Sequence, residues 1–513
     1  MKAIDEQGCT PATGNKPSSL RNKFIAGTAW TAGARWGLRA LGIVNTLIVA
    51  RLLLPQDFGL IAMAIMVSGL VEVWLDFGVR QALIQNQQAD RADYDTAWTL
   101  RIMQGLGIAL LIISFSPLIA KFFNEQRLPH LLWLVSSGII LAGFSNIGIV
   151  NFQKEMDFRR EFILEVVSKL ASIIVTISLA FWLRNYWALA IGIFTRQAAY
   201  FALSYIMHEY RPRLSLERLS SLWSFSQWML VSSVGTQIAS KVDQFIVGKV
   251  ATAGGLGIYT VALELAQMAT NELANPIAKT LLPMMSKVKD DPGKLLYLFL
   301  RIIGGVNTLT IPAGIGLALV AKPFILVVLG EKWIDAIPYL QVFALYGLSN
   351  LLFTGSNSVL IATGKVRMYS GLLWLEAVML LTFSLIGYHW AGLLGIAYAR
   401  IAASLVYQLA VYFCLAGVIR LWFFSILEQL WRPATATAVM ASALSAIPFE
   451  ALGAMPVILF ASIATGVFVY SLCLFLLWAF SGRPDGLESM AIYTLGRVAS
   501  RFKTSGKKSE QGR

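Results

Sequence analysis

The segment IVNTLIVARLLLPQDFGLIAMA at residues 43–64 occurs again, in altered form, as KVDQFIVGKVATAGGLGIYTVA at residues 241–262. At a constant offset of 198 residues the matched pairs are Val44/Val242, Ile48/Ile246, Val49/Val247, Gly59/Gly257 and Ala64/Ala262. A second match, WALAIGI at 187–193 with WAGLLGI at 390–396, has the nearly equal offset of 203. Two matches at nearly the same offset predict an internal repeat, in which each copy is one structural unit.

The composition is that of a membrane protein. Of the 513 residues, 57% are hydrophobic and 14% are charged, whereas soluble domains carry about 25% charged residues. The mean hydropathy is +0.65. Apolar residues fall in blocks of about 20 or more, which is the length of a membrane-spanning helix. Alternating blocks of about 10, typical of a β-barrel, do not occur.

We therefore predict an all-α polytopic membrane protein with about 14 transmembrane helices. The helices are expected at residues 24–50, 58–79, 96–122, 130–151, 161–183, 186–207, 224–249, 256–280, 296–320, 335–362, 366–388, 391–417, 433–448 and 455–480. The first 20 residues are polar and lack the apolar core of a signal peptide, so the first span is expected to remain uncleaved.

The repeat predicts how these helices are arranged. Its offset spans six helices, an even number, so the two copies have the same orientation and are related by a pseudo-two-fold axis along the membrane normal. Transporters of this plan hold the substrate between the halves. The expected divisions are a disordered cytoplasmic arm (1–22), an N-lobe (23–208), a cytoplasmic linker (209–222), a C-lobe (223–418), two further helices (419–480) and a basic cytoplasmic tail (481–513).

The basic residues predict the orientation in the membrane. When successive loops are assigned to alternate sides, most of the 42 Lys and Arg residues fall on the side of the two termini. The other side carries Arg51, Lys121, Arg127, Arg184, Lys249, Lys322 and Lys332. Cytoplasmic loops are enriched in Lys and Arg, so both termini are expected in the cytoplasm. This distribution also accounts for the net charge of +14 without nucleic-acid binding.

Polar residues form a stripe on the first predicted helix. The stripe consists of Thr28, Thr31, Arg35, Arg39, Gly42 and Thr46, spaced three or four residues apart on one helix face. The positions 198 residues later are Ser226, Met229, Ser233, Gln237, Ser240 and Gln244, with Lys241 beside them. An Arg at the bilayer centre costs about 2.5–3.5 kcal/mol on insertion scales, so two on one face are expected to face protein or water.

The two stripes predict the walls of a hydrated cavity between the lobes. We expect Thr31, Arg35, Arg39, Gln237 and Lys241 to bind substrate there. The surplus positive charge favours an anionic cargo, and Arg donates paired hydrogen bonds to phosphate.

Acidic residues at similar depth are candidate counter-charges. Across the predicted hairpins Glu72 is level with Arg35 and Arg39, and Glu264 is level with Lys241. These acids either neutralise the bases and fix the helices or bind a coupling ion. The further candidates are Asp76, Asp243 and Glu272 as counter-charges or ion ligands, and Arg196 and Arg400, near the repeated WAxxxGI motif, as substrate ligands.

The sequence offers no catalytic or metal site. The three His residues are scattered and lie at or near predicted helix ends, and the three Cys residues are far apart. The loops are too short to hold a soluble catalytic domain. No cofactor is expected, although H⁺ or Na⁺ coupling through the acids remains open, as does transport driven by membrane potential or passive exchange.

Five segments carry a family resemblance: ARLLLPQDFGLIAMA (50–64), LDFGVRQALIQ (75–85), VDQFIVGKV (242–250), LGIYTVA (256–262) and GEKWIDAIPYLQVFAL (330–345). With them the chain resembles an oligosaccharide flippase of the polysaccharide transporter family, in the MOP (multidrug, oligosaccharidyl-lipid, polysaccharide) exporter superfamily. The resemblance covers about residues 22–420 and leaves the last two helices outside.

The resemblance implies a cargo and a location. The cargo would be a polyprenyl-diphosphate-linked oligosaccharide, moved across the bacterial inner membrane by alternating access for exopolysaccharide or lipopolysaccharide biosynthesis. Membrane lipids, a polysaccharide polymerase and glycosyltransferases are the expected partners. The alternatives are a cation-coupled multidrug exporter of the same superfamily, a membrane-embedded polysaccharide ligase or polymerase, and a scaffold that transports nothing.

Overall fold

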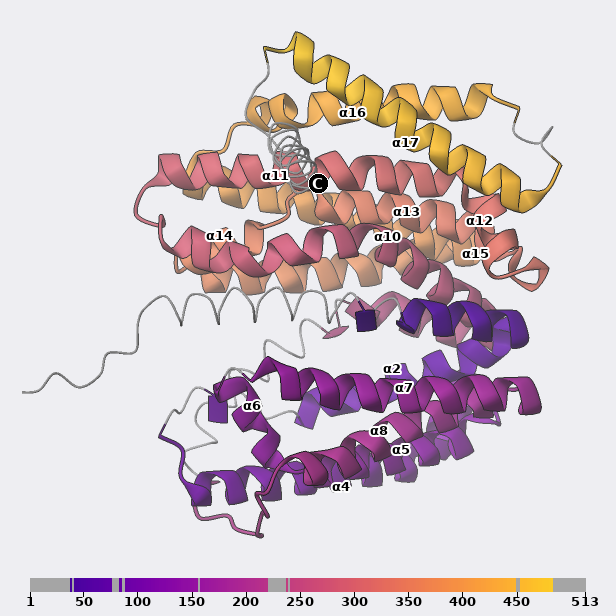
Figure 1. The fold of residues 1–513 in the computed structure, drawn as a ribbon, viewed down its shortest axis with the longest axis vertical. Helices are drawn as coiled ribbons and strands as arrows, with labels where there is room; N and C mark the ends of the chain where they lie inside the picture. The colour runs from indigo at the N-terminus through magenta and orange to yellow at the C-terminus, as the bar shows by residue number, and fades with distance from the viewer. Residues whose placement is uncertain are drawn as a thin grey trace, which may run out of the picture.

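The computed structural model describes residues 37–38, 41–75, 83–84, 88–155, 157–219, 237–238, 240–448 and 453–482, with the backbone alone at 74–75, 158, 271–280 and 350–351. Within these ranges the regular structure is helical and contains no strand, as the sequence predicts. The helices run roughly side by side in two groups, one above the other in Figure 1.

The first group, which we call the N-terminal group, lies in the lower part of Figure 1. It comprises a helix at Leu41–Leu52, then α2 (Pro55–Leu75), α4 (Arg91–Phe123), α5 (Leu128–Phe144), η1 (Ile147–Ile149), α6 (Val150–Lys154), α7 (Phe158–Leu183) and α8 (Trp187–Met207). Asp90 begins α4 with a reciprocal cap, in which its side chain accepts from the Asp93 amide and the Asp93 side chain accepts from the Asp90 amide.

The second group, the C-terminal group, lies above it. It comprises a helix at residues 240–250, then α10 (Ala253–Ser286), α11 (Pro292–Leu319), α12 (Ala321–Val328), η2 (Glu331–Trp333), α13 (Ala336–Leu351), α14 (Ser356–Ala362), α15 (Val366–Ile419), α16 (Phe423–Ala446) and α17 (Met455–Phe480). The helices α16 and α17 pack at the outer edge of this group, with α16 against α11.

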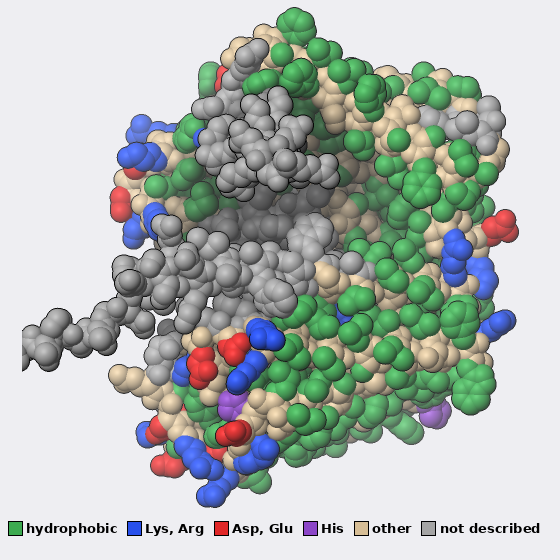
Figure 2. Space-filling view, in the orientation of Figure 1, with side chains coloured by type: hydrophobic (Ala, Val, Ile, Leu, Met, Phe, Trp, Pro, Cys, Tyr) green, Lys and Arg blue, Asp and Glu red, His purple; other side chains and the backbone are tan. Residues whose placement is uncertain are grey.

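Several helices are long and apolar enough to cross a membrane. Among the described residues these are Pro55–Val73, Arg91–Phe123, Arg159–Leu183, Pro292–Leu319, Val366–Ile419 and Met455–Phe480. Figure 2 shows charged side chains gathered at the two ends of the helices, with a broad hydrophobic surface between them. This is the surface of a multi-pass membrane protein.

Some predicted helices are interrupted in the structure. The predicted helix 130–151 bends by 69° between α5 and η1, where the Asn146 side chain accepts from the Gly148 amide. The predicted helix 335–362 is broken into α13 and α14 near Gly355, whose φ is +96°. The predicted helix 433–448 begins ten residues earlier, at Phe423, because Pro433 is accommodated inside α16.

The long helix α15 is two helices joined at a sharp break. Its backbone leaves the helical region at Ala391 and Gly392, and Gly392 has φ +61° and ψ −138°, which is a conformation for glycine alone. Gly387 and Gly395 lie so close across this break that a Cβ on Gly395 would be 1.8 Å from the Gly387 carbonyl oxygen. The break separates the two spans predicted at 366–388 and 391–417.

The two groups meet where α2 crosses α10. A Cβ on Gly59 would be 1.7 Å from the Ala253 carbonyl oxygen, and a Cβ on Gly257 would be 1.9 Å from the Pro55 carbonyl oxygen. Only glycine permits so close an approach of the two backbones. We call the end of the molecule where α2 and α10 begin the crossing end, and the opposite end the linker end.

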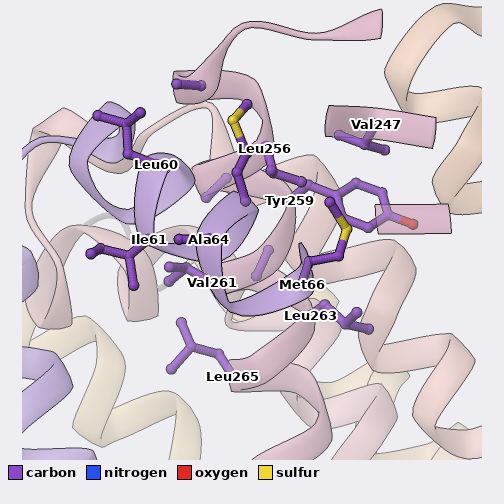
Figure 3. Packing of buried hydrophobic residues seen from close by; sticks show 14 of the residues in the cluster. Leu60, Ile61, Ala64, Met66, Val247, Leu256, Tyr259, Val261, Leu263 and Leu265 are labelled. Carbon is purple, nitrogen blue, oxygen red and sulfur yellow. The ribbon is translucent and has the colours of Figure 1, made fainter. Parts of the chain in front are cut away.

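Next to the crossing, apolar side chains of both groups form one continuous core. Figure 3 shows Leu60, Ile61, Ala64 and Met66 of α2 beside Val247 and beside Leu256, Tyr259, Val261, Leu263 and Leu265 of α10. In a membrane such contacts stabilise through close packing, because lipid is as apolar as the side chains. The core therefore joins the two groups near the crossing end.

The described part of the linker (209–219) is attached to the N-terminal group. The amides of Arg213, Ser215 and Arg218 donate to side chains of α4, at 2.8 Å to Asp95, 2.9 Å to Thr99 and 3.2 Å to Thr96 respectively. The Tyr210 hydroxyl also donates to Asp95, at 2.5 Å. Burial, together with this carboxylate, raises the pKa of Tyr210 well above its usual range.

Candidate functional site

A buried ion pair lies inside the C-terminal group. Asp243, on the helix 240–250, is completely buried, and Arg400, on the second half of α15, is 5% exposed. The Arg400 guanidinium donates to the Asp243 carboxylate. The Tyr259 hydroxyl of α10 donates to the same carboxylate oxygen at 2.5 Å. Three elements are thus joined around one carboxylate.

An aromatic ring also lies beside the guanidinium. The Arg400 Cζ atom lies 4.7 Å from the ring centroid of Tyr346 on α13, a distance at which the ring face attracts a cation. A buried charge without a partner costs several kcal/mol, whereas a pair with hydrogen-bonded neighbours is tolerated. Arg400 and Asp243 therefore act as one neutral unit that fixes the packing of four helices.

Lys241 lies two residues before Asp243 on the same helix and is less enclosed. Its side chain is half-buried and donates to the Gln244 side-chain oxygen at 3.1 Å. Asp243, Arg400 and Glu264 all act on it electrostatically. Glu264 itself is exposed on α10. The structure thus gathers two cations and two carboxylates around the start of helix 240–250.

Gln237 lies between the two groups of helices. A Cβ on Gly69 of α2 would be 3.5 Å from the Gln237 amide nitrogen. Ser240, one turn further, donates to the Gln237 carbonyl at 3.0 Å. Gln237, one residue of the polar stripe predicted on this segment, therefore lies against α2 of the N-terminal group.

Arg196 is in a different environment from Arg400, although both follow a copy of the same motif. On α8, Arg196 lies 3.3 Å from Glu165 of α7, and its side chain is 53% exposed. An exposed pair of this kind contributes little to stability. The two arginines are therefore not equivalent in position, burial or partner.

Lys169 of α7 reaches the first helix of the N-terminal group. Its ammonium donates to the Leu38 carbonyl, and a Cβ on Gly42 would be 2.9 Å from Lys169 Nζ. Gly42 belongs to the predicted stripe of Arg35 and Arg39, so this cation lies at the stripe as well.

The remaining predicted site residues fall in three classes. Thr31, Arg35, Arg39 and Asp76 lie outside the described residues, and Glu272 is described by its backbone in α10 alone. Glu72 has an exposed side chain near the end of α2 and makes an interaction there. In the part of the chain that the structure describes, no cluster of His, Cys, Asp and Glu could hold a metal ion.

Sequence reasoning missed the two tyrosines of the buried pair. Tyr259 lies in the segment LGIYTVA, where a hydroxyl on the otherwise apolar face of a helix signals a buried hydrogen bond. Tyr346 gives no such signal, because the sequence does not distinguish an aromatic ring that stacks on a cation from an ordinary core residue.

Comparisons with known proteins identify the family. A family described as "Polysaccharide biosynthesis protein" matches residues 48–338. The lipopolysaccharide biosynthesis protein WzxC of Escherichia coli is 26% identical over 403 residues, which is 77% of this chain and 81% of that protein. The teichuronic acid biosynthesis protein TuaB of Bacillus subtilis is 26% identical over 428 residues, covering 82% of this chain and 88% of its own.

Solved structures of flippases and exporters share the fold. The inward closed conformation of the lipid II flippase MurJ matches 88% of this chain and 99% of its own length, with a TM-score of 0.71 and 15% identity. An inward-facing multidrug resistance MATE transporter of the MOP superfamily matches 75% and 94%, with a TM-score of 0.59 and 15% identity. The resemblance drawn from the motifs is confirmed: the chain belongs to the polysaccharide biosynthesis protein family and has the fold shared by MurJ and the MATE transporters.

Proposed function

We propose that the protein is a flippase, not an enzyme, and that it moves a polyprenyl-diphosphate-linked oligosaccharide across the bacterial inner membrane for exopolysaccharide or lipopolysaccharide biosynthesis. The family match over residues 48–338 carries this proposal. The names of the relatives WzxC and TuaB point to the same pathway class. The MurJ-like fold supports a transporter architecture.

The architecture we propose has fourteen spans in two lobes of six, followed by two further helices. The lobes are residues 23–208 and 223–418, and the linker at 209–222 joins them. The reciprocal approach of Gly59 to Ala253 and of Gly257 to Pro55 supports a pseudo-two-fold axis. Both pairs of equivalent residues, Gly59/Gly257 and Pro55/Ala253, differ by the 198-residue offset of the repeat.

The linker end is assigned to the cytoplasm in this proposal. It holds the linker and the beginnings of α4, α7, α11 and α16, and it carries more of the described Lys and Arg than the crossing end does. The positive-inside rule then places both termini in the cytoplasm and the crossing end outside. The lobes would part alternately at the two ends, with the cargo between them.

The diphosphate is the part of the cargo that the sequence stripe suits best. Arg35 and Arg39 would bind it, with Thr31, Gln237 and Lys241 along the same seam. The position of Gln237 against Gly69 supports a seam between the lobes. Arg400, held by Asp243, is given a structural role instead, and Arg196 is held by Glu165.

Ion coupling is proposed for acids outside the buried pair. Glu72, Asp76, Glu264 and Glu272 remain the candidates for H⁺ or Na⁺ binding, and Asp243 is neutralised by Arg400. Flipping measured under an imposed proton gradient, then under a sodium gradient, separates the two ions from uncoupled exchange. Glycosyltransferases and a polymerase stay predicted partners.

The test of the function is a flipping assay with a charged-seam variant. Purified protein is reconstituted into liposomes with a fluorescent polyprenyl-diphosphate oligosaccharide, and its transfer between leaflets is followed. Arg35→Ala with Arg39→Ala is expected to lower the rate by at least about tenfold, because a charge-assisted contact to phosphate contributes about 1.5–3 kcal/mol. The matched control replaces two exposed arginines, Arg159→Ala with Arg367→Ala. Wild-type flipping by a folded Arg35/Arg39 variant would refute the assigned role.

The MATE-like fold favours one other candidate, a cation-coupled multidrug exporter. Such a protein needs a cavity with a surplus of acids to bind cationic compounds. Competition in the same liposomes distinguishes the two functions. A diphosphate lipid should block flipping by the proposed flippase, whereas cationic dyes should be transported by the alternative and leave lipid transfer unaffected.

A further inference from the structure

Arg51 and Lys249 occupy equivalent positions in the repeat, 198 residues apart, at the crossing end. Each one reaches across to the opposite group of helices. The Arg51 guanidinium donates to the Val328 carbonyl at 3.1 Å and also to the Val327 carbonyl. The Lys249 ammonium donates to the Phe122 carbonyl at 2.7 Å.

Both cations bind the carbonyl end of a helix. Val327 and Val328 are the last two residues of α12, and Phe122 is in the last turn of α4. The last four carbonyls of a helix have no partner within the helix, and this end carries partial negative charge. A cation there satisfies the carbonyls and the helix dipole together. Lys249 also lies 4.5 Å from the centroid of the Phe122 ring.

Two further donors of the C-terminal group bind backbone carbonyls of the N-terminal group. The Trp333 indole donates to the Ala50 carbonyl at 2.8 Å, and the Lys332 ammonium lies 3.4 Å from the Arg51 carbonyl. These carbonyls end the helix Leu41–Leu52. Trp333 is completely buried, so its N–H has no water to replace this bond.

These contacts share one property: each joins the N-terminal group to the C-terminal group at the crossing end. An opening at this end would leave three helix ends without their donors. The contacts also occur in two directions, as expected of the two copies of a repeat. Arg51 of the N-terminal group binds the C-terminal group, and Lys249 of the C-terminal group binds the N-terminal group. They do not depend on any residue of the proposed cargo seam.

We propose that Arg51, Lys249 and Trp333 form a latch between the repeats, which keeps the crossing end closed until the cargo is released on that side. The latch rests on the proposed function for its biological role, because release implies transport. Its closure of the crossing end is a property of the chain alone and is tested without cargo.

The test measures access to Ala50 beneath the latch. In a background with Cys9, Cys414 and Cys473 replaced by Ser, Ala50→Cys is introduced, because Ala50 is completely buried. The protein is placed in lipid nanodiscs and treated with a charged, water-soluble thiol reagent. Gln126→Cys, at an exposed position of the crossing end, gives the reference rate.

Removing the latch is expected to expose the probe. Arg51→Gln with Lys249→Gln should raise the modification rate at residue 50 about tenfold, the change that corresponds to about 1.4 kcal/mol. Each single variant should have a smaller effect, and Trp333→Phe should add to either. Lys249→Arg, which keeps the cation, should restore slow modification.

The control variants replace cations at the same end that stay within one group. Arg127 pairs with Glu125, two residues away, and Lys121 is exposed at the end of α4. Arg127→Gln with Lys121→Gln should leave the rate unchanged. An equal rise in this control, or no rise in the latch variant at either Ala50→Cys or the second buried probe Val247→Cys, would overturn the latch.

The outcome also separates the latch from the proposed function. Fast modification in the latch variant together with no lipid flipping by the wild type would support the latch and refute the flippase. Lipid flipping by the wild type, together with an unchanged modification rate in the latch variant, would support the flippase and refute the latch.

Discussion

At the scale of single residues, the charges of this protein fall into two kinds. Asp243 and Arg400 are enclosed by packed helices and neutralise each other. Arg196 and Glu165 are paired but exposed. Burial, rather than pairing, separates them, because the cost of losing a partner depends on how far water can replace it.

This difference predicts unequal effects of removing one partner. Asp243→Asn keeps the shape of the side chain but leaves the Arg400 guanidinium buried without a counter-charge, and it should lower the free energy of unfolding by about 3–5 kcal/mol. Arg196→Gln should change it by at most about 1 kcal/mol. Thermal unfolding in detergent measures both.

A double variant distinguishes lost charge from lost packing. Asp243→Leu with Arg400→Met removes both charges and should recover most of the stability, because apolar replacements of a buried pair are often neutral. If Asp243→Asn alone unfolds at the wild-type temperature, the guanidinium reaches water and the pair is not enclosed.

At the scale of elements, the sequence predicted the helices better than their interruptions. The helix 455–480 has its predicted bounds, and α4, α7 and α8 lie close to theirs. The bend before η1 depends on Asn146. Its side-chain amide donates to the Tyr210 carbonyl at 2.7 Å and to the His208 carbonyl at 3.3 Å. The spacing of apolar residues in the sequence cannot predict a contact between segments that lie so far apart in the chain.

At the same scale, we predict that the attachment of the linker depends on pH. Burial lowers the pKa of His208 below its usual value of 6.5, and the neutral ring accepts a hydrogen bond from the Tyr210 amide at 3.0 Å. The charges that act on this ring are Glu155, Glu209, Arg160 and Arg211. A linker released into water would bind a proton more readily than the attached one.

The sign of the pH effect follows from this difference. Attachment of the linker should be complete above about pH 6.5 and should weaken as the pH falls below that value. Hydrogen exchange in residues 209–219 should therefore become faster, relative to its intrinsic rate, between about pH 7 and 5.5. His208→Asn keeps an acceptor that does not titrate and should remove this dependence. The same pH profile in that variant would assign the effect to another group.

At the scale of the whole molecule, the sequence predicted an internal repeat, but it predicted only part of the candidate site. The matched segments contain Gly59 and Gly257, at which α2 crosses α10 in the structure, but the offsets alone did not predict this crossing. The partner of Asp243 was not readable. It is supplied by α15, and the rotation of that helix is decided by packing around Tyr346 and Tyr259. Arg196 and Arg400 both follow a copy of the WAxxxGI motif, but their partners and their burial differ.

The crossing itself yields the last prediction. If the two lobes are related by the repeat, Gly59→Ala and Gly257→Ala should have equal effects, since each new methyl would meet a backbone carbonyl of the other lobe at less than 2 Å. Overpacking of this kind costs about 1–3 kcal/mol. The backbone carbonyls cannot rotate away, so the two lobes would have to separate.

The measurement is thermal unfolding together with modification at Ala50→Cys, which reports the separation directly. Gly417→Ala is the matched control, because a Cβ there meets nothing within 4 Å, and a helical alanine is favoured over glycine by about 1 kcal/mol. Its unfolding temperature should stay the same or rise. A large effect at Gly59 with none at Gly257 would contradict the two-fold crossing, because equivalent methyls would then meet different surroundings.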